Sequence, residues 1–348
     1  MKTFQSIVLF SLIYFYKNIF AFIPSGRGEH NAVLIDKRLY FHGGSRWGEG
    51  HAPDQLFYLD VSKSFTTYEI SLMPWTNLSS ISGVTCRNGA TACADETTIY
   101  YIGGCHCGGL VSKFDTISLQ CSEPTNFGSI PREEMQFVQC AILGHNIICL
   151  CGAQLYSATL LNDSILCIGG KFGSVYACQT NSNQELPISI FNINNNTWRI
   201  ITTSGQIPTK KCDHASVYIP QHNRILLFYG LDDITINSLD TLTFTWTIPV
   251  ILNSGGPPRR LTRHTATLIG AYVLIAFLTI YDPINSIQPI PTSPTSQTSP
   301  TSPSNISIGV AIASSGIIGM IIGGGIMGCL RSIIERANIN RVNYDRLP

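Results

Sequence analysis

Short apolar runs that end in glycine recur along the chain. They end at Gly44, Gly104, Gly170 and Gly230, in the stretches RLYFHGG, TIYYIGG, SILCIGG and RILLFYG. After a loop, each is followed by a second run that contains an aspartate or asparagine; these residues are Asp60, Asp115, Asn192 and Asp240. Apolar runs of this length, bounded by glycine and polar turn residues, predict β-strands, so we expect an all-β protein.

A further strand is predicted before each glycine-terminated run. Six such first strands align on one position, which holds His30, Ala90, Met135, Tyr156, His214 and His264. Only 21 positions separate Met135 from Tyr156, so the third unit is predicted to lack its outer strands. The sixth unit is also predicted to be incomplete, because its run YVLIAF has no glycine pair after it.

This repeating unit resembles the kelch repeat, which forms one blade of a β-propeller. The resemblance rests on Arg27 and His30 before a strand, on three glycine pairs and on the terminal Trp198 and Trp246; the pairs are Gly43–Gly44, Gly103–Gly104 and Gly169–Gly170. It implies a kelch-type propeller over residues 22–287, of about six blades with the third and sixth incomplete. In that family the glycines allow close backbone approach, and the tryptophan fills the space between blades.

Both ends of the chain carry long apolar segments. Residues 1–21 are predicted to be a signal peptide, with an N-terminal membrane anchor as the alternative. Residues 306–330 contain no charge and are predicted to form a transmembrane helix. Arginines follow in residues 331–348, which we expect to be a cytoplasmic tail. The prediction is a type I protein of the plasma membrane or another secretory-pathway membrane, with its propeller extracellular or lumenal.

Two further features fit a cell-surface protein. Residues 288–305 are almost wholly Pro, Ser and Thr, and we expect them to form a stalk. Sequons for N-glycosylation occur at Asn77, Asn162, Asn195 and Asn305. Glycines at small-xxx-small spacing in residues 306–330 also favour a dimer through the transmembrane helix.

The stretch CHC, with Cys105 and Cys107 around His106, raises the question of a metal site. The spacing CxC is weak evidence for zinc, and a secreted site competes with oxidation. Cys149 and Cys151 occupy the equivalent position in the next unit, so a disulfide between these two regions is the preferred interpretation. Other cysteines, such as Cys93, Cys140 and Cys167, are interpreted as small apolar residues of buried strands. We expect no metal and no cofactor.

The sequence predicts binding and no catalysis. Charged residues make up 12% of the chain and the net charge is +1, which gives no basis for nucleic-acid binding. We expect the propeller loops to bind an extracellular protein or glycan, with Arg46 and Trp47 as candidate contact residues. The alternatives are a copper-dependent enzyme similar to galactose oxidase, which also carries a kelch propeller, and a decayed paralogue with little function.

Overall fold

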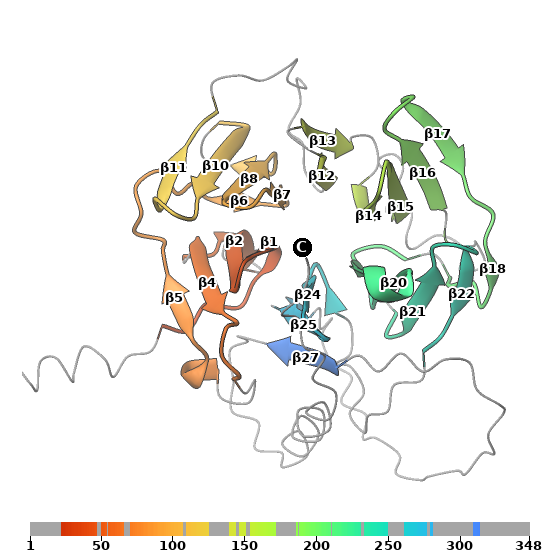
Figure 1. The fold of residues 1–348 in the computed structure, drawn as a ribbon. Coiled ribbons are helices and arrows are strands. Elements are labelled where there is room, and N and C mark those ends of the chain that lie inside the picture. Colours follow the sequence, from red (N-terminus) through yellow and green to blue (C-terminus); the bar gives the residue numbers. More distant parts are fainter. Residues whose placement is uncertain are drawn as a thin grey trace, which may run out of the picture.

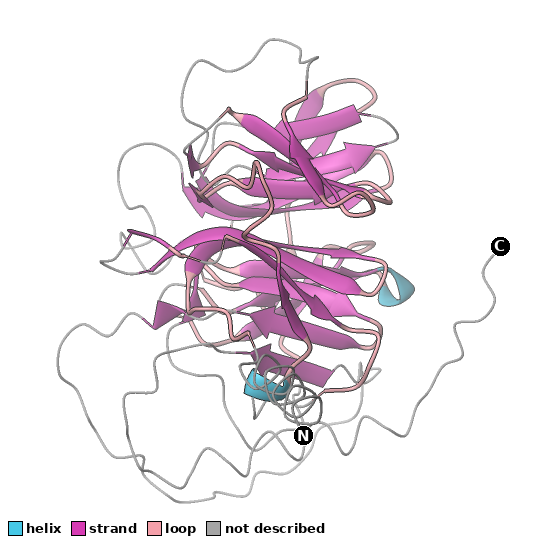
Figure 2. Ribbon diagram, turned by 90° about the vertical axis from the view of Figure 1, so that its left-hand side faces the viewer, coloured by secondary structure: helices cyan, strands magenta, loops and turns pink. Residues whose placement is uncertain are grey.

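The fold is known from a computed structural model. It describes residues 22–46, 50–53, 55–65, 70–106, 109–124, 139–143, 146–150, 154–171, 186, 188–209, 211–230, 233–249, 261–276, 279–280 and 309–313. Strands dominate this part of the chain, and its helices are two 3-10 turns, η1 (Ile70–Leu72) and η2 (Pro220–His222) (Figure 2). The all-β prediction is confirmed.

Four antiparallel sheets have the order of propeller blades and stand around a common centre (Figure 1). Blade 1 contains β1 (Gly28–Ile35), β2 (Arg38–Arg46), β4 (Leu56–Asp60) and β5 (Trp75–Asn77). Blade 2 contains β7 (Thr91–Ala94), β8 (Thr98–Ile102), β10 (Val111–Asp115) and β11 (Gln120–Ser122). Blade 4 contains β14 (Gln154–Leu161), β15 (Ser164–Lys171), β16 (Ile188–Asn192) and β17 (Thr197–Ile200). Blade 5 contains β19 (Ala215–Ile219), β20 (Arg224–Phe228), β21 (Ile236–Asp240) and β22 (Thr245–Thr247).

The two units predicted to be incomplete form smaller sheets. In the described part of the chain, blade 3 is a hairpin of β12 (Gln139–Leu143) and β13 (Asn146–Leu150). Blade 6 pairs β24 (Thr265–Ile269) with β25 (Tyr272–Ala276), and β25 also pairs with β27 (Gly309–Ala313). The part of the chain that the structure describes therefore contains four complete blades and not about six, and the two smaller sheets belong to the third and sixth units, which were expected to be incomplete.

β27 lies inside the segment that the sequence assigned to a transmembrane helix. It pairs in parallel with β25, from Gly309 beside Tyr272 to Ala313 beside Ala276. Residues such as those of GVAIA suit an apolar helix and a buried parallel strand equally well, so hydropathy could not separate the two. No helix in the described ranges is long and apolar enough to cross a membrane. The remainder of 306–330, together with residues 1–21, 288–305 and 331–348, lies outside the described residues.

The remaining strands are short connections. They are β3 (Gly50–His51), β6 (Arg87–Asn88), β9 (Cys105–His106), β18 (Ser204–Gly205), β23 (Leu261–Thr262) and β26 (Thr279–Ile280). β3 extends blade 1, and β18 runs parallel to β22. β6 pairs with β9, and β23 pairs with β26.

The recurring aspartate or asparagine caps the turn between the third and fourth strands. The Oδ1 of Asp115 accepts from the N–H groups of Ile117 and Ser118 at 2.9 and 2.7 Å. Asp240 does the same for Leu242 and Thr243 at 2.9 Å each. Asn192 and Asp60 hold their turns in the same manner. This repeated residue is explained by turn formation, because a short polar side chain can satisfy turn amides.

The core lies between blades, and the outer-strand tryptophan shows how it is built. Trp246 of β22 is fully buried among side chains of blade 4, including Leu166 and Ile188. Trp75 of blade 1 packs in the same direction, against Leu274 of blade 6. The predicted role of the tryptophan as filler between neighbouring blades is confirmed for Trp246, and Trp75 has the same role; for Trp198, the other residue of the prediction, it is wrong, because that side chain is 55% exposed.

Candidate functional site

The beginnings of the first strands surround a central cavity of about 250 Å³. All six units contribute to its wall, with backbone and small or polar side chains from residues 29–32, 89–92, 139, 157–158, 213–216 and 263–266. Because first and second strands are antiparallel, the second strands finish at this same end of the propeller. We call this end the loop face, since it carries the connections to the third strands. The opposite end, the turn face, carries turns such as residues 36–37.

A chain of backbone hydrogen bonds runs from blade to blade around the loop face. The N–H of Arg263 donates to the carbonyl of Asp213, that of Glu29 to Arg263, and that of Gly89 to Glu29, at 3.3, 3.3 and 2.9 Å. These four residues directly precede the aligned histidine position, and each has a positive φ, between 55° and 65°. Three of them are not glycine, and this conformation is uncommon for other residues. The belt therefore connects blades 5, 6, 1 and 2 at the cost of some local strain.

The side chains of the same belt form the charged mouth of the cavity, which we call the channel mouth: Glu29, Asp213 and Arg263. Arg263 makes an ion pair with Glu29, and its Nε lies 3.8 Å from Asp213 Oδ2. Ser45 and Asn88 donate to Glu29 Oε2 at 3.1 and 3.4 Å. Burial, together with the nearby Glu29 carboxylate, raises the pKa of Asp213 in spite of Arg263. Arg263 is about a third exposed and is the most accessible of the three.

The aligned histidines connect neighbouring blades. His30 Nε2 of blade 1 lies 3.0 Å from Thr265 Oγ1 of blade 6, and His214 Nε2 of blade 5 lies 3.1 Å from Ser157 Oγ of blade 4. In both pairs the hydroxyl belongs to the residue after the aligned position of the preceding blade. At the same place in blade 5 stands Ala215, so His264 of blade 6 meets no hydroxyl. Neither of its ring nitrogens has a partner in hydrogen-bond geometry.

These histidines are buried in the neutral form. Desolvation, with Lys211 and His264 nearby, lowers the pKa of His214 to about 3, and desolvation lowers that of His264 to about 4. Desolvation, with Arg27 and His264 nearby, also lowers the pKa of His30. The positions that could have suggested a metal or an acid–base site are therefore interblade packing residues.

Three basic residues, each three positions before the aligned residue, hold the loops of their own blades. Arg27 donates to the carbonyl of Gly43 at 2.9 Å, and Arg87 donates to that of Gly103 at 2.8 Å. Lys211 occupies the same place in blade 5. Lys211 is three residues before His214, as Arg27 is three residues before His30. This spacing could have identified Lys211 as a loop-holding residue from the sequence, where it was not predicted.

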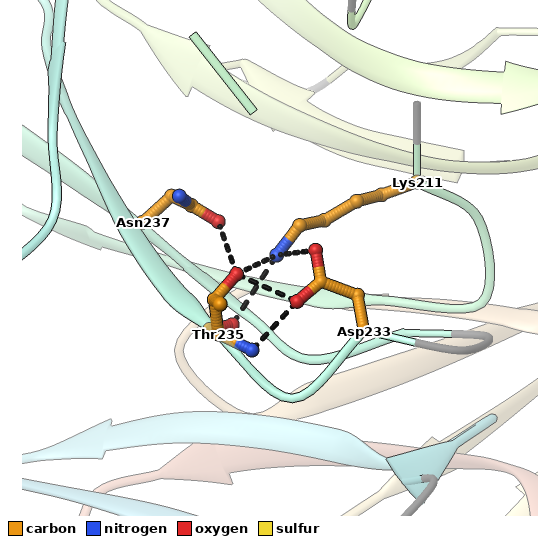
Figure 3. Close-up of polar contacts among 4 residues, drawn as sticks. All are labelled: Lys211, Asp233, Thr235 and Asn237. Carbon is orange, nitrogen blue, oxygen red and sulfur yellow. Dashed lines mark hydrogen bonds and ion pairs between the residues drawn. The ribbon is translucent and has the colours of Figure 1, made fainter. Parts of the chain in front are cut away.

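Lys211 is the centre of a polar network on the loop face (Figure 3). Its Nζ lies 2.9 Å from Asp233 Oδ2 and donates to the Thr235 carbonyl and hydroxyl at 3.2 and 3.0 Å. The Thr235 hydroxyl also lies within hydrogen-bond distance of Asp233 and Asn237. Burial lowers the pKa of Lys211, whereas hydrogen bonds from Thr235 and Lys211 outweigh burial and lower the pKa of Asp233. Because the lysine is fully buried, this network fixes the loop before β21 and does not present a free cation.

Few of the predicted site residues meet in one place. Arg46 is half-buried at the end of β2 and pairs with Gly50 of β3; the residue before it, Ser45, donates to Glu29 of the channel mouth. Trp47 lies outside the described residues. Asn77, Asn162 and Asn195 are all exposed, while Asn305 lies outside the described residues.

Of the four cysteines in the predicted disulfide region, Cys105 is the one whose side chain lies in the described part of the chain. Cys105 is an exposed free thiol, so the disulfide expected from it is not made. Cys107 and Cys151 lie outside the described residues, as does the side chain of Cys149. Cys93, Cys140 and Cys167 are free and pack in apolar clusters, as predicted. Cys86 and Cys212 are each disulfide-bonded, which the sequence did not single out.

Across the described ranges there is no group of three or more His, Cys, Asp or Glu side chains that could hold a metal ion. His30 and His214 already contact hydroxyls of neighbouring blades. The galactose-oxidase interpretation therefore finds no ligand set among these residues.

Part of the chain is similar to known proteins. It is 27% identical over 127 residues to human Kelch domain-containing protein 3, and 25% identical over 126 residues to the bovine protein of that name. Each match covers 34% of this chain and 30% of the relative, so the chain spans about a third of the length of the curated relatives it matches. No protein-family model matches the chain. The repeated blades and this similarity together support a kelch-repeat β-propeller.

Proposed function

We propose that this kelch-type propeller is a non-catalytic scaffold that binds a protein or glycan on its loop face. The observation that carries the proposal is the channel mouth. There a charged belt with left-handed backbone surrounds a cavity of about 250 Å³, and Ser45, the neighbour of Arg46 in β2, donates to Glu29 of that belt. Residues held in uncommon conformations concentrate at binding sites, and propellers present their long loops on one face.

A charge reversal on each face tests this assignment. The purified full chain is applied to glycan and protein arrays, and hits are titrated with Arg46→Glu and with Lys37→Glu as the matched control. Lys37 is exposed in the turn between β1 and β2, on the turn face. We expect Arg46→Glu to weaken binding about tenfold and Lys37→Glu to leave it unchanged. Equal effects of both variants would place the binding site elsewhere.

Metal analysis tests the non-catalytic part of the proposal. We expect the purified chain to contain no stoichiometric metal after dialysis against a weak chelator. Stoichiometric copper together with alcohol oxidation would overturn the scaffold assignment.

We further propose that the propeller faces the outside of the cell or the lumen of the secretory pathway, on a membrane-anchored chain. Three sequon asparagines are exposed, and disulfides persist in oxidising compartments. Because β27 takes residues 309–313, the anchor would lie in the apolar residues 314–330. Digestion of the full chain with an N-glycosidase should increase its gel mobility, and Asn195→Gln should remove part of that shift. A chain whose mobility does not change would contradict this location.

A further inference from the structure

Among the described residues, blade 3 has no third or fourth strand, and we call the space outside β13 the blade 3 gap. In blades 1, 2, 4 and 5 the second strand pairs on its outer edge with a third strand, namely β4, β10, β16 and β21. In the described part of the chain, β13 pairs only with β12. Its sequence NIICL is apolar and uncharged, and an edge strand of this kind is a template for pairing with another strand.

The blade 4 side of the gap exposes apolar side chains. Trp198 packs on Phe191 at 5.0 Å between ring centroids, and Phe191 packs towards Ile148 of blade 3. Trp198 corresponds to Trp246 of blade 5, which is fully buried, yet Trp198 is 55% exposed. Ile200, on the same face of β17, is 83% exposed. A neighbouring outer strand would cover both residues, and blade 3 has none among the residues described here.

The blade 2 side of the gap is more polar. Val111 of β10 packs towards Ile142 and Ile147 of blade 3. Lys113 lies two residues further along β10, so it is on the same face but further from the centre of the blade 3 hairpin. A strand that filled the gap would need apolar side chains towards blade 4 and polar or acidic ones towards Lys113, on alternate positions.

Blade 6 shows that this propeller accepts a third strand from a distant segment. There β27 pairs with β25 although 32 residues separate the two strands, and it runs parallel where the other blades have an antiparallel third strand. An incomplete blade in this protein is thus completed by a strand that its own hairpin does not supply.

We propose that the blade 3 gap binds an extended, alternating strand of a partner protein. This strand pairs with the outer edge of β13 and covers Trp198 and Ile200. Binding by strand addition draws its affinity from main-chain hydrogen bonds and its specificity from alternate side chains. This site is separate from the channel mouth, so each can fail without the other.

A synthetic peptide provides the probe. It alternates valine with glutamate or threonine, so that one face is apolar, for Trp198 and Ile200, and the other is acidic and polar, for Lys113. The fluorescently labelled peptide is titrated with the full chain by anisotropy, against a scrambled peptide. Trp198→Glu and Ile200→Glu should weaken binding about tenfold or more, and both residues are exposed enough for the variants to fold. Ile248→Glu is the matched control, because Ile248 follows Trp246 as Ile200 follows Trp198 and is 51% exposed.

Hydrogen exchange then locates the bound strand. Amides of residues 147–150 should exchange more slowly when the peptide is bound, while those of β17 change less. Absence of peptide binding, equal loss in Ile248→Glu, or protection at another blade would overturn the proposal. Light scattering without peptide tests whether the chain associates with itself. If it does, and if Ile200→Glu abolishes this association, the gap binds a second copy of the chain and the proposal is overturned.

Discussion

The residue after each aligned histidine decides how two first strands meet. Thr265 and Ser157 give His30 and His214 a hydroxyl, whereas Ala215 leaves His264 without one. A buried polar atom without a partner costs free energy, and a hydrogen bond typically contributes about 1 kcal/mol. The difference between these three pairs is therefore a difference in local stability.

Supplying the missing hydroxyl should stabilise the protein. We expect Ala215→Ser to raise the free energy of unfolding by about 1 kcal/mol, because a serine here reproduces the pair of His214 with Ser157. Ser157→Ala is the reciprocal variant and should lower it by about 1–2 kcal/mol. Urea unfolding measures both values, and destabilisation by Ala215→Ser would show that this site has no room for the hydroxyl.

The buried histidines should also make stability depend on pH. The pKa of His214 is about 3 and that of His264 about 4 in the folded chain, against 6.5 as the ordinary value. The unfolded chain therefore binds more protons below pH 6.5, so stability is complete above that pH and is lost as pH falls towards 4. Each histidine contributes up to about 1.4 kcal/mol per pH unit. Urea unfolding at pH 7, 6 and 5 checks this, and His214→Gln should have a shallower slope; stability that stays constant would contradict it.

At the scale of the element, the outer-strand tryptophan of a blade packs against the blade that precedes it. Trp246 and Trp198 have the same place in the repeat. Each lies opposite the residue that precedes the turn-capping position of the third strand, Leu239 for Trp246 and Phe191 for Trp198. Only the preceding blade differs. Burial of a repeated residue is thus set by whether the neighbour has outer strands.

Truncation of the two tryptophans should separate these cases. We expect Trp246→Ala to cost about 3–5 kcal/mol, because it leaves a cavity between blades 4 and 5. Trp198→Ala should cost about 1 kcal/mol or less, because the side chain is mostly in solvent. Thermal or urea unfolding of the two variants gives the comparison. Similar costs would indicate that other parts of the chain bury Trp198.

At the scale of the whole molecule, blades approach so closely that some positions exclude a side chain. A Cβ on Gly43 would meet the carbonyl oxygen of Arg87 in the next blade, and one on Gly169 would meet that of Lys211 at 2.8 Å. Both contacts are between blades, and they agree with the predicted reason for the first glycine of each pair.

Gly43→Ala should therefore destabilise the protein more than its backbone conformation alone requires. Gly43 and Gly50 both have positive φ, but a Cβ on Gly50 has nothing within 4 Å. Gly50→Ala should cost about 1 kcal/mol for the conformation, and Gly43→Ala about 2 kcal/mol more for the clash. Unfolding free energies of the two variants test the difference, and equal values would mean that Arg87 moves aside at little cost.

The sequence by itself determined the all-β class, the repeating unit and the shortage of strands in the third unit. It could do so because each unit repeats its glycine, its turn-capping residue and its apolar runs in the same order, so the pattern is visible within a short stretch of sequence. The tertiary structure decided the rest. Contacts between blades determine the clustering of Glu29, Asp213 and Arg263, the pairing of His214 with Ser157 and the exposure of Trp198. Pairing with β25 inside blade 6 determines the use of residues 309–313 as a strand. Those contacts join segments far apart in the chain, and local pattern carries no information on which neighbour a side chain will meet.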